Sequence, residues 1–128
     1  MSRNRRGFTI IEMLIVCLII GILVAIAMPR FASTRDKAAL ASVRSDVRNA
    51  ETAEEAYFAD AGRYGTLSEL QNSTNFNVAV GNGIAIASAP NGYTINVNNA
   101  TITAGTTSCS VQVGAGASPA IDSRITCP

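Results

Sequence analysis

An apolar run from Phe8 to Met28 constrains this chain more than any other feature, and Glu12 is the only charged residue within it. As a helix the run measures about 31 Å, close to the hydrocarbon thickness of a bilayer. A carboxylate at the centre of a membrane helix costs about 2.5–3.5 kcal/mol on insertion scales. The run therefore predicts a membrane-spanning helix, and its acid requires an explanation.

The flanks of the run indicate its orientation and exclude several functions. Arg3, Arg5 and Arg6 precede it, so the short N-terminal side should stay cytoplasmic and the remainder should face outward. Residues 60–128 contain only Arg63 and Arg124 as bases, so nucleic acid is not expected as a direct specific ligand. The chain has no histidine, which excludes histidine-based catalysis and the common zinc sites. We expect no enzyme activity, metal or cofactor.

The pattern after Pro29 becomes amphipathic and predicts that the helix continues to about residue 61, where Gly62 ends it. One face carries an apolar stripe, formed by Leu40, Val43, Val47, Ala50 and Tyr57. Charged residues, Asp46 and Glu54 among them, are expected on the solvated faces. Gly21 and Pro29 both disfavour helix, so the segment between them should lose helical bonds more easily than its neighbours.

The residues after Gly62 predict a small head. A short turn of helix is expected at residues 67–70, and Asn98–Asn99 is expected as a two-residue hairpin turn. Six short β-type runs are predicted, at 76–80, 84–87, 93–98, 101–103, 108–113 and 121–127. The predicted class is α+β: a long N-terminal helix, apolar in its first half and amphipathic in its second, packed on a small antiparallel sheet.

Two ordinary interpretations of the first thirty residues leave part of the pattern unexplained. A secretory signal peptide fits the basic flank and an A-x-A site at 25–27, but Glu12 interrupts the front of its apolar core. A plain signal anchor leaves Glu12 without a role.

A third interpretation comes from a resemblance. The segment RRGFTIIEMLIV, followed by the apolar run and Pro29, resembles the N-terminal signature of type IV pilins (type IVa-like prepilins) and pseudopilins. The resemblance implies cleavage between Gly7 and Phe8 and N-methylation of Phe8. It also implies assembly roles for Phe8, Glu12, Gly21 and Pro29. The implied parts are a leader (1–7), a transmembrane and filament-core half-helix (8–29), an amphipathic half-helix (30–61) and a head (62–128).

Cleavage would place a positive amine on Phe8, close to a carboxylate in an apolar setting. At about 4 Å and an effective dielectric of 20, such charges attract by about 4 kcal/mol. Glu12 could therefore pair with the Phe8 amine of a neighbouring subunit and set the axial register. It could instead reach the amine of its own helix, four residues away.

Two further features bear on the head and on assembly. Cys109 and Cys127 could form a disulfide in an oxidising compartment, as the resemblance implies, or remain two buried thiols. On the second half-helix Arg44 and Arg48 precede Glu51, Glu54 and Glu55, an order opposite to the preference of the helix dipole. The basic band of one subunit could therefore meet the acidic band of another, and the alternative is a simple solvated face.

The resemblance implies a structural subunit, a major pilin that polymerises into an extracellular type IV pilus. The alternatives are a type II secretion pseudopilin or minor pilin and, in another class, a membrane-anchored binding domain that does not assemble. Asp60, Glu69 and Asp122 are too scattered to predict the acidic calcium loop common in major pseudopilins, which favours a pilin. The implied partners are identical subunits, a prepilin peptidase and methyltransferase, an inner-membrane assembly platform and, before assembly, membrane lipid. The implied location is the inner membrane first and the extracellular filament afterwards.

Overall fold

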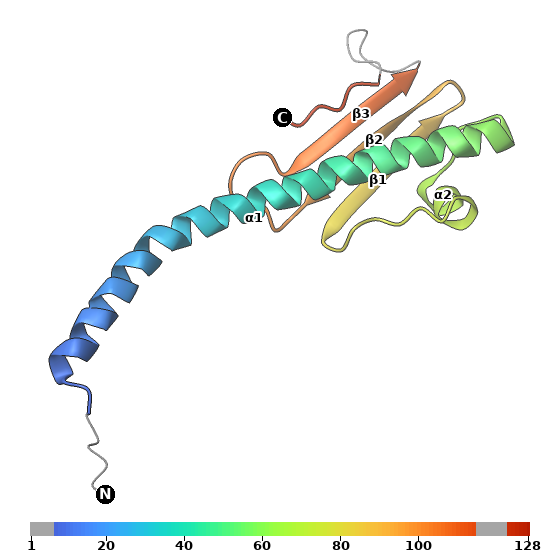
Figure 1. Ribbon diagram of the computed structural model, residues 1–128. Helices are drawn as coiled ribbons and strands as arrows, with labels where there is room; N and C mark the ends of the chain where they lie inside the picture. Colours follow the sequence, from blue (N-terminus) through green and yellow to red (C-terminus); the bar gives the residue numbers. More distant parts are fainter. Residues whose placement is uncertain (1–6, 115–122) are drawn as a thin grey trace, which may run out of the picture. The chain divides into compact units, whose positions relative to one another are not determined.

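The computed structural model describes residues 7–114 and 123–128 (Figure 1). Its elements in chain order are two helices, α1 (Ile10–Ala61) and α2 (Leu67–Ser73), and three strands, β1 (Asn82–Ala89), β2 (Gly92–Asn99) and β3 (Ser108–Gly114). This order and the antiparallel sheet confirm the α+β class. The chain divides into two compact units, one ending at Thr34 and the other running from Arg35 to Pro128.

The first unit consists mainly of the apolar half of α1. Leu, Ile and Val side chains dominate it, and α1 is continuous through Gly21 and Pro29. Proline has no N–H to donate to the preceding turn, so Pro29 is tolerated there at the cost of one helical hydrogen bond. In the part of the chain that the structure describes, α1 is the one helix long and apolar enough to cross a membrane.

The second unit packs a three-stranded antiparallel sheet, in the order β1-β2-β3, against the amphipathic half of α1 (Figure 1). Ile86 pairs with Ile95, and Ile95 pairs with Val111 on the next strand. The core joins α1, α2 and the sheet through buried side chains, chiefly Val43, Val47, Ala50, Leu70, Ile95, Val97 and Val111. This confirms the predicted stripe, with Leu40 and Tyr57 partly buried at its margins.

The end of α1 agrees with the prediction from the sequence. Gly62 adopts a left-handed backbone with φ 68°, and its N–H donates to the carbonyl of Phe58 at 2.9 Å. Glycine takes this conformation without the steric penalty of a Cβ, so the helix stops there.

Three of the predicted elements in the head are wrong. Asn98 and Asn99 are strand residues of β2, and the two-residue turn between β1 and β2 is Pro90–Asn91. Residues 76–80 and 101–103 are not strands. In both segments backbone N–H groups donate to side chains, that of Ala79 to Asp46 and that of Thr101 to Asn99, rather than to a ladder. The bond from Thr101 to Asn99 is local and the bond from Ala79 reaches α1, and each occupies an N–H that a strand would use in its ladder.

The last predicted strand, 121–127, begins outside the described residues. Within the described part, Thr126 forms an isolated antiparallel bridge with Ser110 of β3. The short helix predicted at 67–70 is present and extends to Ser73 as α2.

Candidate functional site

The predicted processing site lies just before α1. Gly7 and Phe8 are exposed and precede the first helical residue, Ile10. Among the described residues, no atom lies within 4 Å of the position that a Cβ on Gly7 would occupy. The bond between Gly7 and Phe8 is therefore in non-helical, open backbone, and the basic residues before it lie outside the described part of the chain.

Glu12 closes a capping box with Thr9. The backbone N–H and the hydroxyl of Thr9 both donate to Oε2 of Glu12 at 2.8 Å, and the N–H of Glu12 donates to the Thr9 hydroxyl at 3.3 Å. This pattern satisfies N–H groups at a helix start that would otherwise lack partners. The signal for it is present in the sequence as Thr-Ile-Ile-Glu, but the predictions considered Glu12 only as a charge. Glu12 thus has a local role in the unprocessed chain.

The apolar half of α1 forms a continuous exposed hydrophobic surface. Every residue from Ile10 to Met28 is exposed, and the large side chains Ile10, Ile11, Leu14, Leu18, Leu23, Ile26 and Met28 are each more than 60% accessible. Cys17 is a free, exposed cysteine on the same surface. Water-soluble monomers rarely expose apolar patches of this extent, so lipid or protein must cover this surface.

Buried polar side chains fasten the head to α1. Asp46 is 4% exposed, and its Oδ2 accepts from the N–H of Ala79 at 2.9 Å and from Nδ2 of Asn82 at 2.7 Å. The Asn82 amide also donates to Ser42 at 3.0 Å and accepts from Asn99 at 2.6 Å. This network joins α1, β1 and β2, and it contradicts the expectation that Asp46 faces solvent.

Glu54 is the second buried acid on α1 and also contradicts that expectation. Its Oε2 accepts from the N–H of Gly65 at 2.9 Å, while Oε1 has no hydrogen-bond partner among the described residues. Burial raises the pKa of Glu54, the Gly65 hydrogen bond lowers it, and the charges of Glu69 and Glu55 raise it further. Glu54 therefore secures the loop after α1 and is unavailable for an acidic surface band.

That loop also carries an exposed ion pair. Arg63 contacts Glu69 through both terminal nitrogens, at 2.5 and 3.2 Å, and lies over the ring of Tyr57. The Arg63 hydrogen bond, together with the Thr66 N–H and hydroxyl, lowers the pKa of Glu69 to about 2. Glu69 is the N3 residue of a capping box whose N-cap residue is Thr66, and its Oε2 accepts from the Thr66 N–H at 2.8 Å.

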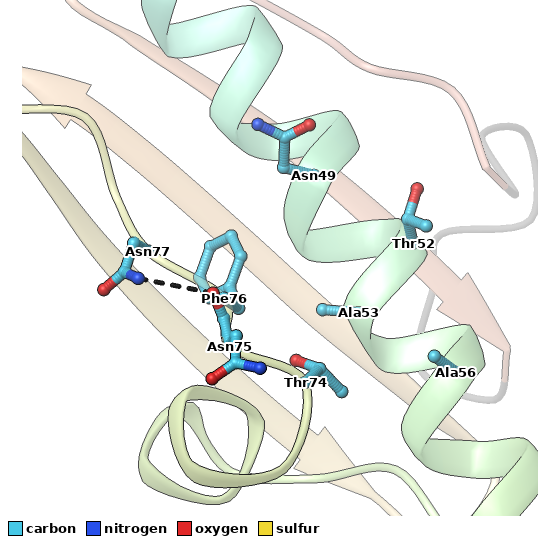
Figure 2. A pocket seen from close by; sticks show the side chains of 8 residues that line it. All are labelled: Asn49, Thr52, Ala53, Ala56, Thr74, Asn75, Phe76 and Asn77. Carbon is cyan, nitrogen blue, oxygen red and sulfur yellow. Dashed lines mark hydrogen bonds between the residues drawn. The ribbon is translucent and has the colours of Figure 1, made fainter.

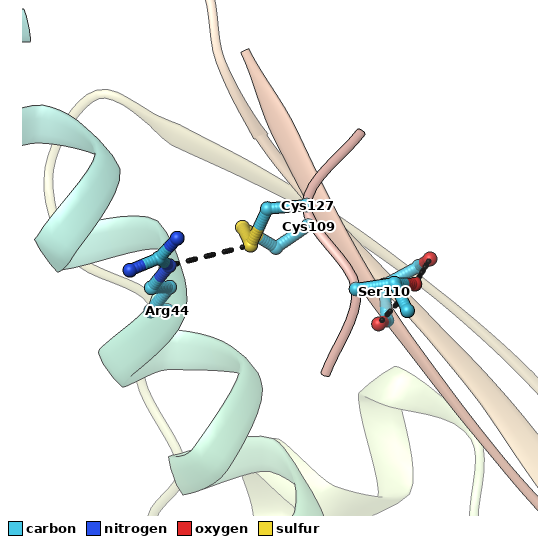
Figure 3. The surroundings of a disulfide bond; sticks show 5 residues. Arg44, Cys109, Ser110 and Cys127 are labelled. Atoms are coloured by element: carbon cyan, nitrogen blue, oxygen red, sulfur yellow. Dashed lines mark hydrogen bonds between the residues drawn. A yellow bond between two sulfur atoms is a disulfide. The ribbon is translucent and has the colours of Figure 1, made fainter. Parts of the chain in front are cut away.

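Cys109 and Cys127 form a disulfide, as predicted (Figure 3). It joins β3 to the C-terminal segment, and Cys109 is fully buried. Nε of Arg44 donates to Sγ of Cys127 at 3.4 Å, so the bridge also contacts α1.

The head has a shallow groove of about 470 Å³ between α1 and the segment after α2 (Figure 2). Side chains from both sides line it, including Asn49 and Thr52 from α1 and Asn75 and Asn77 from the segment. No group of three or more His, Cys, Asp or Glu residues suited to a metal ion occurs among the described residues; Asp122 lies outside them.

Residues 2–28 match the family described as "Prokaryotic N-terminal methylation motif". The type IV major pilin protein PilA of Myxococcus xanthus is 35% identical over 79 residues, 62% of this chain and 34% of that protein. The type IV narrow pilus major component PilA5 of Thermus thermophilus is 60% identical over 38 residues, 30% of this chain and 33% of that protein. The type II secretion system core protein G of Klebsiella michiganensis is 36% identical over 67 residues, 52% of this chain and 47% of that protein.

The motif, the exposed apolar helix and the small disulfide-bonded head together define a pilin-like structural protein. Over part of its length the chain is similar to both type IV pilins and type II secretion core protein G, and its N-terminal 2–28 segment matches the methylation motif. It spans between about a third and a half of the length of the relatives named above.

Proposed function

We propose that this chain is the major subunit of an extracellular type IV pilus. The observation that carries the proposal is the exposed apolar half of α1, directly preceded by the methylation motif. Such a surface suits the hydrocarbon of a bilayer and equally suits the same surface of a second copy. A subunit can therefore leave the membrane by exchanging lipid for neighbouring helices without passing through water.

Processing is the first step of the proposal. A prepilin peptidase cuts between Gly7 and Phe8, and the new Phe8 amine is methylated. The inner-membrane assembly platform then moves the subunit from lipid into the filament. Mass spectrometry of the mature chain tests this step: a methylated N-terminal Phe8 supports it, whereas a start at Met28 or an intact Met1 contradicts it.

Assembly is the second step. In the filament, Glu12 of one subunit pairs with the Phe8 amine of its neighbour, and Gly21 and Pro29 let the intervening helix loosen as copies pack. Before cleavage Glu12 instead belongs to the capping box with Thr9. The acid thus has one partner in the precursor and another in the polymer.

Variants at two positions separate these roles. Glu12→Gln retains a side chain that can accept hydrogen bonds but loses the charge, and Thr9→Ala removes the box while retaining the charge. We expect E12Q to abolish surface filaments and T9A to leave their yield nearly unchanged. The opposite ranking, or normal filaments from Glu12→Ala, contradicts the pairing with Phe8.

A pseudopilin is the second candidate, favoured by the match to core protein G over half of this chain. Shearing cells that carry a complete pilus machinery distinguishes the two functions. Long surface filaments composed of this chain support the major pilin. Restored protein secretion in a strain lacking its own core protein G, without long filaments, supports the pseudopilin instead.

A further inference from the structure

The amphipathic half of α1 carries a charged stripe, which we define as Lys37, Arg44, Arg48, Glu51 and Glu55. Lys37, Arg44, Arg48 and Glu55 are exposed and Glu51 is half-buried. With 3.6 residues per turn, all five lie within an arc of about 60° on one side of the helix. The stripe is basic toward its N-terminal end and acidic toward its C-terminal end.

The order of charges does not favour the isolated helix. Arg44 and Arg48 are four residues apart and repel one another, as do Glu51 and Glu55. Bases precede acids, which the helix dipole disfavours. Arg48 and Glu51 lie three residues apart, yet among the described residues only Arg63 and Glu69 form an ion pair within 4.0 Å. Arg48 and Glu51 therefore attract one another without forming an ion pair within 4.0 Å, and the four charges remain accessible to partners on another molecule.

The spacing of the charges indicates a partner helix that carries the same order of bases and acids. Arg44 precedes Glu51 by seven residues, and Arg48 precedes Glu55 by the same number. Seven residues are nearly two helical turns, so the two pairs share one side of the helix with a drift of only about 20°. One axial displacement of about 10 Å therefore aligns Arg44 and Arg48 with Glu51 and Glu55 of an identical helix, with Lys37 opposite Arg44 as the one like-charged contact.

We propose that the charged stripe is a docking surface for a second copy of this chain, lying parallel and displaced by seven residues. Arg44 of one copy then faces Glu51 of the next, and Arg48 faces Glu55. The inference rests on the proposed function, since it assigns a register to the filament contact. Glu54, which the sequence alone had assigned to the acidic band, takes no part because it is buried against Gly65.

The groove beside the basic end of the stripe leaves Arg44 and Arg48 accessible, and a hydrogen bond restricts Arg44. Arg44 and Arg48 line an open groove of about 250 Å³ with Ile125 and Cys127. The hydrogen bond from Arg44 to Cys127 restricts the orientation of the Arg44 side chain. Since a restricted side chain loses less entropy on pairing, Arg44 is well placed to bind a carboxylate.

Charge reversal in the full-length chain tests the register. The variants are Arg48→Glu, Glu55→Arg and the double exchange R48E/E55R, expressed in cells with a complete pilus machinery. Arg35→Glu is the matched control, because Arg35 is also exposed but lies on the opposite side of α1. The yield of sheared filaments, relative to the cellular pool of the chain, is the measurement.

We expect each single reversal to lower filament yield about tenfold, because it replaces an attraction by a repulsion at every contact along the filament. The double exchange should return the yield to within about twofold of the unchanged chain, as R35E should. In the monomer R48E gains an attraction between positions 44 and 48 and acquires a repulsion between positions 48 and 51, so a change in the stability of the helix alone does not explain a tenfold loss. Unaltered yields from the single variants overturn the proposal.

The double exchange also distinguishes the register from an antiparallel one, in which Arg44 would face Glu55 and Arg48 would face Glu51. There R48E/E55R would set Arg44 against a new arginine and Glu51 against a new glutamate, so a yield as low as that of the single variants overturns the parallel arrangement.

If the cells make no filaments, the proposed function has failed, but the register of two copies can still be tested by cross-linking. In a Cys17→Ser background, a chain carrying R48C and a chain carrying E55C are expressed together. A disulfide-linked pair between these two chains supports the register. No such pair, or one formed only between R48C and E51C chains, overturns it.

Discussion

Replacing Asp46 by alanine is expected to destabilise the head strongly, because Asp46 supplies the acceptor for two donors in a nearly buried site. The N–H of Ala79 and the amide of Asn82 both donate to its Oδ2, and Asp46 is 4% exposed. A buried donor that loses its acceptor costs about 1–3 kcal/mol. Asn82 retains its hydrogen bond to Ser42, so its loss falls at the lower end of that range.

The sum is a loss of about 3 kcal/mol for Asp46→Ala. Asp46→Asn retains an acceptor oxygen and loses the charge, which predicts about 1 kcal/mol, since charge-assisted hydrogen bonds are roughly twice as strong as neutral ones. Asp36 provides the control. It also accepts from a distant loop, at Thr103 and Ala104, but it is only partly buried, so Asp36→Ala should cost less than about 1 kcal/mol.

Urea unfolding of the full-length chain in detergent measures these differences. The chain has no tryptophan, and its three tyrosines, Tyr57, Tyr64 and Tyr93, all lie in the unit that begins at Arg35. Tyrosine fluorescence therefore reports on the head without interference from the apolar helix. A loss below about 1 kcal/mol for D46A, or equal losses for D46A and D36A, would refute the role assigned to the buried network.

Two further predictions concern the disulfide and the buried acid. Cys109 and Cys127 are 18 residues apart, so reducing their disulfide should lower the free energy of unfolding by about 3 kcal/mol in the chain-entropy model. The same urea assay with and without dithiothreitol measures this change. An unchanged unfolding midpoint would contradict it. Burial raises the pKa of Glu54 in the folded head above that in the unfolded chain, which is about 4.3. Between these two pKa values the folded head binds more protons than the unfolded chain. The contribution of Glu54 to stability is therefore fully present below about pH 4.3 and is lost as the pH rises through the folded-state pKa. Glu54→Gln, which retains an oxygen for the Gly65 N–H, should reduce the fall in stability between pH 5 and pH 8, and an identical pH dependence in both proteins would contradict the assignment.

The N-terminal half of the molecule could be predicted almost completely from local patterns. A run of apolar residues as long as a bilayer is thick, a helical repeat of apolar residues, and a glycine at the helix end each act through neighbours a few residues away. The capping box of Thr9 and Glu12 is equally local. The charge of Glu12 suggested the Phe8 amine as its partner, on a neighbouring subunit or on its own helix, whereas in the unprocessed chain its partners are the N–H and hydroxyl of Thr9, three residues away.

The head depended on contacts that no local pattern contains. Asp46 finds its donors 33 and 36 residues further along the chain, and Glu54 finds Gly65 eleven residues away, so periodicity assigned both acids to solvent. The hairpin turn was misplaced at Asn98–Asn99 for the same reason, since the Asn99 side chain is engaged with Asn82 and Thr101.

What the sequence determined by itself is therefore the apolar helix, its amphipathic continuation and the N-terminal methylation motif, because each follows from residues close together in the chain. The tertiary structure alone decided which charges are buried and which remain on the surface. A carboxylate enters the interior only where a donor from another part of the fold reaches it, from Ala79 and Asn82 for Asp46 and from Gly65 for Glu54, and these donors meet it only in the folded head.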